Sequence, residues 1–178
     1  GYTSDPAPNG TQLQSLGRKM AFYNGYEPKQ SIGLYPTRGT SKAISYGEIG
    51  IPGFTLELGT EFFEKCDVFE NDIVPKNIPM LTYAAKAVSA PYVLPQGPEV
   101  YDLKLNGIAG NLAVKPGEQV SFTASVDDSR HSTRKGTEPS QTVAQVEYYI
   151  NTPDWNGGTA ITMTAVDGSM NETNEGVT

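Results

Sequence analysis

One short stretch of the chain sets a carboxylate among apolar residues. Residues 54–58 read Phe-Thr-Leu-Glu-Leu and are bounded by glycines, a pattern that predicts a short strand. Alternation places the three apolar side chains on one face and Thr55 and Glu57 on the other. A carboxylate in such a strand is costly unless it is solvated, paired or working. The pattern alone leaves open whether Glu57 does chemistry or belongs to the polar face of a surface strand.

The residues that precede this stretch complete a longer pattern. Tyr35 lies on a turn that contains Gly39, Tyr46-Gly47-Glu48 follows, and the interval from Tyr35 to Glu57 is 22 residues. This arrangement resembles the C-terminal part of a zinc carboxypeptidase of the carboxypeptidase A type (the M14 metallocarboxypeptidases), over about residues 1–97. The resemblance implies that Glu57 is the general base, which passes a proton from a metal-activated water to the leaving amine. It also implies that Tyr35 closes over a peptide or protein substrate.

The same resemblance points to residues that bind substrate. Counted from Tyr35 without a gap, Lys42 matches the position at the base of the family's specificity pocket, where the charge of the residue selects the terminal side chain of the substrate. A lysine there implies a preference for a C-terminal Glu or Asp. Thr55 would line the same pocket, and Thr37 would also contact the substrate. The alternative for Lys42 is a solvated lysine at the tip of a loop.

Zinc is the cofactor that the resemblance implies, but the chain lacks a set of ligands for it. His131 is the single histidine, and one imidazole cannot build a His-His-carboxylate site. In the family the ligands are a His-x-x-Glu pair and a distant His, all N-terminal to the tyrosine loop, and residues 1–34 contain no match. We therefore expect this chain to be the C-terminal portion of a longer enzyme, inactive alone, with its zinc ligands outside residues 1–178.

Three other groups of residues are weaker candidates. Asp127, Asp128 and His131 share a polar loop and could bind a cation, although such residues are usually only solvated. Trp155 lies in a glycine-containing turn and is either a binding platform or a plug at the edge of a sheet. Cys66 is the single cysteine, so an internal disulfide is excluded, and a partly buried free thiol is a better interpretation than a nucleophile.

Composition excludes several classes of protein. The formal net charge of −7 argues against binding to nucleic acid or to anionic membrane surfaces. No apolar run approaches the length of a membrane span. The resemblance favours a secreted or periplasmic location.

Residues 1–95 are expected to form the C-terminal part of an α/β catalytic domain. A helix is predicted over about 12–24, ended by Gly25, with an apolar stripe. A second helix is predicted to begin near the prolines at 75 and 79 and to end by about 90, with the stripe Ile78, Leu81, Ala85 and Val88 facing a sheet. Two helices with two or three strands would leave sheet edges unpaired, which argues for a missing N-terminal part of the domain.

A proline-rich linker at 91–98 precedes a region with period-two patterning. Strands are predicted over 100–105, 112–114, 120–126, 143–150 and 160–166, which is typical of an immunoglobulin-like β-sandwich over 98–178. The tail after Asp167 lacks apolar partners, so the sandwich is expected to be incomplete. A different class of function remains open, in which the sandwich is a non-catalytic binding or adhesion module.

Overall fold

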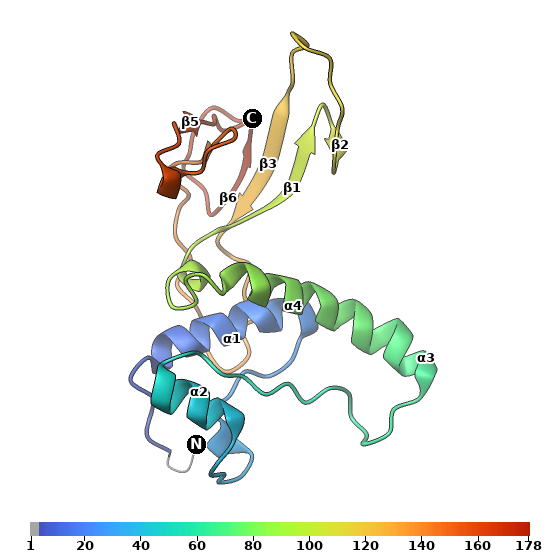
Figure 1. The fold of residues 1–178 in the computed structure, drawn as a ribbon, viewed down its shortest axis with the longest axis vertical. Helices are drawn as coiled ribbons and strands as arrows, with labels where there is room; N and C mark the ends of the chain where they lie inside the picture. Colours follow the sequence, from blue (N-terminus) through green and yellow to red (C-terminus); the bar gives the residue numbers. More distant parts are fainter. Residues whose placement is uncertain (1–3) are drawn as a thin grey trace. The chain divides into compact units, whose positions relative to one another are not determined.

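The computed structural model describes residues 4–178, and the chain packs as two compact units (Figure 1). The first unit comprises residues up to Gln96 together with His131–Glu138, and the second comprises Gly97–Arg130 and Pro139–Thr178. The chain thus leaves the first unit, returns to it for eight residues and leaves again. The division predicted at residues 91–98 does not include this return.

In its described residues the first unit has only helices as regular structure, so the strands expected of an α/β domain over 1–95 are not found there. Its elements are α1 (Gly10–Asn24), η1 (Ser31–Gly33), α2 (Ser41–Ile49), α3 (Cys66–Val68), the π-helical turn η2 (Phe69–Ile73), α4 (Val74–Ala87) and η3 (Leu94–Gln96). The prediction of α1 is confirmed, including its end at Gly25, which has a φ of 71°. Such a left-handed residue is the usual way for a helix to end, and glycine adopts it without strain.

One continuous helical rod runs from α3 through η2 into α4, as Figure 1 shows. The prolines lie near the start of α4, as predicted, but the chain is already helical from Cys66. A proline ring clashes with the carbonyl four residues earlier. For Pro75 that residue is Asn71, which lies in the widened π turn. The π turn thus allows the helix to continue past Pro75, which would otherwise end it.

The core of the first unit lies between α1 and α4. Leu16 and Met20 of α1 pack against Met80, Tyr83 and Ala87 of α4. Met80 has no exposed surface, and complete burial of such a side chain stabilises the fold by about 1.5–3 kcal/mol.

The stripe predicted for the second helix is wrong. Ile78, Leu81, Ala85 and Val88 are exposed. The buried face is the one that carries Asn77, Met80 and Tyr83. Residues on each of the two faces recur at helical spacing, so spacing alone does not choose between them. The buried face includes the polar Asn77, which made the other face the more apolar of the two in the sequence.

The strand predicted over 54–58 is also wrong, since residues 50–58 have no regular secondary structure. A strand exists only where a neighbour completes its ladder of hydrogen bonds. Among residues 4–178 no segment pairs with this one. The alternating pattern is present in the sequence, but it cannot form a sheet alone.

The second unit is built on antiparallel strands. They are β1 (Glu99–Leu105), β2 (Ile108–Ala109), β3 (Phe122–Asp127), β4 (Glu147–Tyr148), β5 (Ile161–Thr162) and β6 (Asn174–Val177), with the short helix η4 (Asp154–Asn156) between β4 and β5. The first three and β6 form a sheet in the order β2-β1-β3-β6, and β4 pairs with β5. Asn106 and Gly107 have φ values of 49° and 78°, as the two-residue turn between β1 and β2 requires.

The strand predictions for the second unit have mixed outcomes. β1 and β3 are confirmed, whereas the strand predicted at 112–114 is absent from the described residues. The tail was expected to lack partners, yet it forms β6, which pairs with β3, and Val177 is fully buried. The core also contains Val126, Val146 and Met163. The described residues therefore combine helices with small antiparallel sheets.

Candidate functional site

The segment that carries Glu57 rests on helix α1 rather than in a sheet. Leu56 packs against the cluster of Leu16, Met20 and Met80. The Phe54 ring passes close to Gly17, where a β-carbon would lie 3.7 Å from it. Of the three apolar side chains that were predicted to face a sheet, only Leu56 is partly buried, against the helices, whereas Phe54 and Leu58 are exposed, as are the polar Thr55 and Glu57.

A network of buried amides fixes the end of this segment. The Gly59 N–H donates to the Tyr26 hydroxyl at 3.3 Å, and Asn77 Nδ2 donates to the same hydroxyl at 3.3 Å. Asn24 Nδ2 in turn donates to Asn77 Oδ1 at 3.1 Å. Both asparagines are buried. The segment is thereby tied to α1 and α4, although it belongs to neither.

Glu64 holds the turn that follows the segment. Its Oε1 accepts the N–H groups of Thr60 at 2.5 Å and of Glu61 at 2.9 Å. These two hydrogen bonds favour the carboxylate and lower the pKa of Glu64 below its ordinary value of 4.5. Gly59 has a φ of 77°, and a β-carbon there would lie 2.4 Å from the same oxygen. The left-handed backbone favours glycine, and any side chain at this position would also have to displace the Glu64 carboxylate.

The two residues expected to be catalytic are both free to meet solvent. Tyr35, in the loop between η1 and α2, is 62% exposed, and Glu57 is exposed. No hydrogen bond or ion pair joins either side chain to another residue in the range 4–178. The Glu57 carboxylate is therefore exposed to solvent, and no hydrogen bond in the described chain connects it to Tyr35.

The structure brings Lys42 and Thr55 together. Lys42 Nζ, on α2, donates to Thr55 Oγ1 at 3.2 Å. Gly53 permits this approach, because a β-carbon on it would lie 2.9 Å from Lys42 Cα. Thr37, the third expected substrate residue, has its hydroxyl buried without a hydrogen-bond partner among the described residues. The Thr40 hydroxyl in the same loop is in the same state.

The other polar residues that sequence singled out serve local structure. Asp127 Oδ1 accepts the Ser129 N–H at 2.7 Å, and Asp128 Oδ2 accepts the Gln141 N–H at 2.5 Å. His131 belongs to the first unit and these aspartates to the second. Within residues 4–178, no three His, Cys, Asp or Glu side chains form a group that could hold a metal ion. Cys66 is a free thiol, but it is exposed rather than partly buried as predicted.

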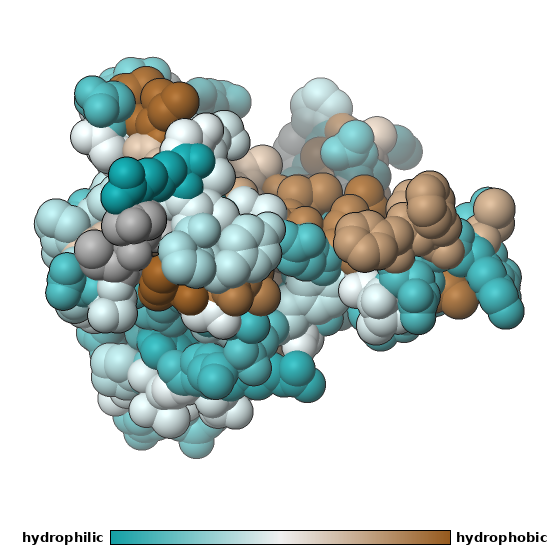
Figure 2. Space-filling model, turned by 90° about the horizontal axis from the view of Figure 1, so that it is seen from below, coloured by the Kyte–Doolittle hydropathy of each residue, from teal (hydrophilic) through white to brown (hydrophobic). Residues whose placement is uncertain are grey.

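The Glu57 segment and the turn after it expose apolar side chains. Figure 2 shows patches of brown, hydrophobic surface among teal, hydrophilic surface on the face seen from below. In the first unit the exposed apolar residues include Leu58, Phe62 and Phe63, of which Phe63 is 95% exposed. No helix in the described part of the chain is long and apolar enough to cross a bilayer.

Sequence reasoning missed the residues that hold this segment, namely Tyr26, Asn77 and Glu64. The one signal for them was Asn77, a polar residue between Ile73 and Met80 on one helical face. Compared with known proteins, the chain matches no family model, no curated protein and no solved structure.

Proposed function

We propose that the chain is the C-terminal portion of a zinc-dependent metallocarboxypeptidase, with Glu57 as its general base. The observation that carries the proposal is the motif over 54–58 together with the interval of 22 residues from Tyr35. The exposed carboxylate of Glu57 supports it, because a general base must be free to reach a water molecule and a leaving group.

The role of Glu57 follows from carboxylate chemistry. The carboxylate accepts a proton from the water that attacks the terminal peptide carbonyl, and a new C–O bond forms. It then delivers that proton to the amide nitrogen as the C–N bond breaks, which releases the C-terminal residue. Tyr35, exposed on its loop, closes over the bound peptide and excludes solvent from it.

Lys42 supplies the specificity in this proposal. Its ammonium is held by one neutral hydroxyl, that of Thr55, so it keeps donors for a carboxylate of the substrate. A substrate that ends in Glu or Asp would pair with Lys42, and one that ends in Lys would be repelled. Thr55 orients the ammonium, and the Thr37 hydroxyl is a further polar group in the same loop region.

The residues of this chain do not fit a zinc site, because they include a single histidine and, within 4–178, no group of metal-binding side chains. The proposal therefore places the ligands in polypeptide outside these 178 residues. The second unit is the proposed immunoglobulin-like sandwich of a secreted or periplasmic enzyme. Its antiparallel sheets and shared core support that interpretation.

The test begins with the reading frame that encodes this chain. The proposal requires a His-x-x-Glu pair encoded upstream of Gly1, and a frame without one would overturn it. With that region included, Glu57→Gln should lower kcat by about 10²–10⁴-fold while the bound zinc is retained. Glu48→Gln is the matched control, because Glu48 is also an exposed carboxylate, on the neighbouring helix α2.

Substrate preference is tested in the same protein with peptides that differ only in their last residue. We expect kcat/KM to be highest for a terminal Glu, and Lys42→Glu should reverse the order of Glu and Lys. A clear preference for Leu or Lys in the unmodified enzyme would remove the assigned role of Lys42 and leave that of Glu57 standing.

A further inference from the structure

A tryptophan is displayed at the turn that joins β4 to β5. Trp155 is the only tryptophan of the chain, and it is 82% exposed. Tryptophan is usually among the most buried side chains on average, since its apolar area is large. Exposure of one apolar residue needs no explanation by itself. What distinguishes Trp155 is the hydrogen-bonded turn that carries it and the hollow at that turn.

The turn holds the tryptophan on a fixed backbone. The Pro153 carbonyl accepts the N–H groups of Asn156 and Gly158, each at 3.0 Å, and the Asp154 carbonyl accepts that of Gly157 at 2.8 Å. Asp154 Oδ1 also accepts the Trp155 N–H at 2.8 Å. The backbone that carries the ring therefore needs little further ordering when a ligand stacks on the indole.

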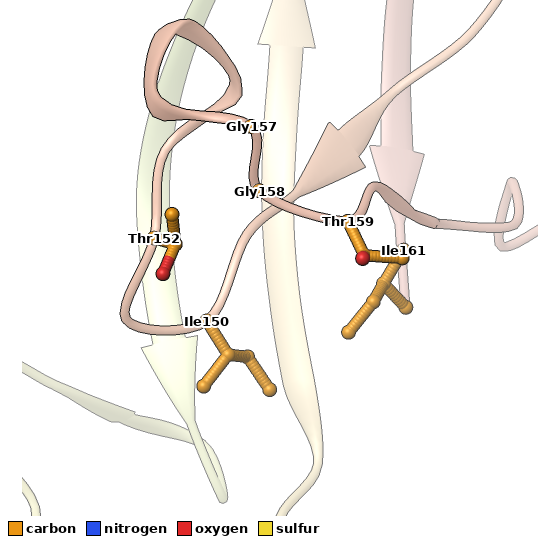
Figure 3. Close-up of a pocket in the computed structure, with 6 residues that line it drawn as sticks. All are labelled: Ile150, Thr152, Gly157, Gly158, Thr159 and Ile161. Carbon is orange, nitrogen blue, oxygen red and sulfur yellow. The ribbon is translucent and has the colours of Figure 1, made fainter.

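A hollow of about 300 Å³ lies between the segments 150–152 and 157–161, which the short helix η4 connects (Figure 3). Ile150 and Thr152 line it on one side, and Gly157, Gly158, Thr159 and Ile161 line it on the other. Trp155 lies between these two segments in sequence and is not itself among the lining residues. The two segments approach closely at Gly158, where a β-carbon would lie 1.9 Å from the Thr152 carbonyl oxygen. Glycine is thus required for the hollow to have this shape.

The chemistry of the hollow selects a neutral ligand. No charged side chain lines it, so neither an anion nor a cation would be paired there. The net charge of −7 further disfavours anions. The lining instead offers two threonines for hydrogen bonds and two isoleucines for apolar contact. A ring with hydroxyl groups at its edge and C–H groups on its face matches this lining and an exposed indole.

We propose that Trp155 and the hollow between β4 and β5 form a binding site for a neutral carbohydrate, in which a pyranose ring stacks on the indole. This function is one of binding, and it does not depend on the peptidase activity proposed for the first unit.

The fluorescence of Trp155 can be used to measure sugar binding. With a single tryptophan, intrinsic fluorescence reports on this position alone. The 178-residue chain should be titrated with the β-1,4-linked hexasaccharides of glucose, N-acetylglucosamine and mannose, with Kd measured independently by calorimetry. We expect a saturable shift of the emission for at least one sugar, with Kd of about millimolar or tighter.

The variants separate stacking from folding. Trp155→Ala should weaken binding about tenfold or more in calorimetry, and Trp155→Phe should recover part of the affinity. Circular dichroism should be unchanged in both, since the side chain is exposed. Phe63→Ala is the matched control, because it removes an exposed aromatic ring of the first unit and should leave binding unaltered. Failure of all three sugars to bind, or equal affinity in Trp155→Ala, would overturn the proposal.

Discussion

Two five-residue segments of this chain have nearly the same pattern and different structures. Residues 54–58 read Phe-Thr-Leu-Glu-Leu, and residues 122–126 read Phe-Thr-Ala-Ser-Val. The second segment lies in β3 between β1 and β6, whereas the first has no ladder partner in the described chain. Alternation therefore determines which side chains share a face, and the presence of neighbours determines whether a strand forms.

The largest expected difference between the two segments is in the hydrogen exchange of their amides. The amides of Ala124 and Val126 lie in a strand that is paired on both sides and should open only with the second unit. Those of Leu56 and Leu58 have no ladder and should exchange almost freely. We expect protection in β3 to exceed that in 54–58 by about a thousandfold or more. Equal protection, measured by NMR, would show that residues 54–58 do pair in solution.

Proline substitution tests the same difference through stability. Ser125→Pro removes a donor from the middle of the sheet, where Ser125 pairs with Tyr101 and Gly176, and should cost about 3 kcal/mol or more. Leu58→Pro removes an N–H that has no ladder partner and should change the free energy of unfolding by less than about 1 kcal/mol. Urea denaturation followed by circular dichroism measures both, and comparable losses would contradict the comparison.

The smallest expected effect concerns Glu64. Its carboxylate accepts the backbone N–H groups of Thr60 and Glu61, just after the segment that has no strand partner. Its lowered pKa means that the carboxylate stabilises the fold above about pH 4.5, and that this contribution is lost as pH falls through the lowered value. Glu64→Gln should therefore be less stable than the unmodified chain at pH 6 and equal to it in strong acid. A difference that does not depend on pH would show that the charge has no role.

Sequence reasoning succeeded where the information was local. Helix α1 and strands β1 and β3 follow from spacing and from turn residues such as Gly25. It failed where structure depends on distant partners. Residues 174–177 read Asn-Glu-Gly-Val, a composition typical of a turn, and they form a strand because β3 offers its edge. The helix stripe was misassigned because Asn77, although polar, is buried by its hydrogen bonds to Asn24 and Tyr26.

The sequence brought together one pair of the candidate residues. Lys42 and Thr55 were expected to lie side by side, and they are hydrogen bonded, while the substrate pocket assigned to them stays a prediction. The support beneath Glu57 was not predictable, since it comes from residues on three separated segments of the chain. The Tyr26 hydroxyl accepts from both Gly59 and Asn77, a junction that no short pattern could indicate.

Residues 131–138 belong to the first unit, so a fragment made by ending the chain at residue 96 would lack part of that unit. Glu138 forms an ion pair with Arg18 and accepts the Ser15 hydroxyl at 2.8 Å, and the Ser132 N–H donates to the Arg18 carbonyl at 2.9 Å. A fragment that stops at residue 96 would leave a largely buried guanidinium without its counterion. A soluble version of the first half would need either those eight residues reattached through a short graft or Arg18 replaced by an uncharged side chain.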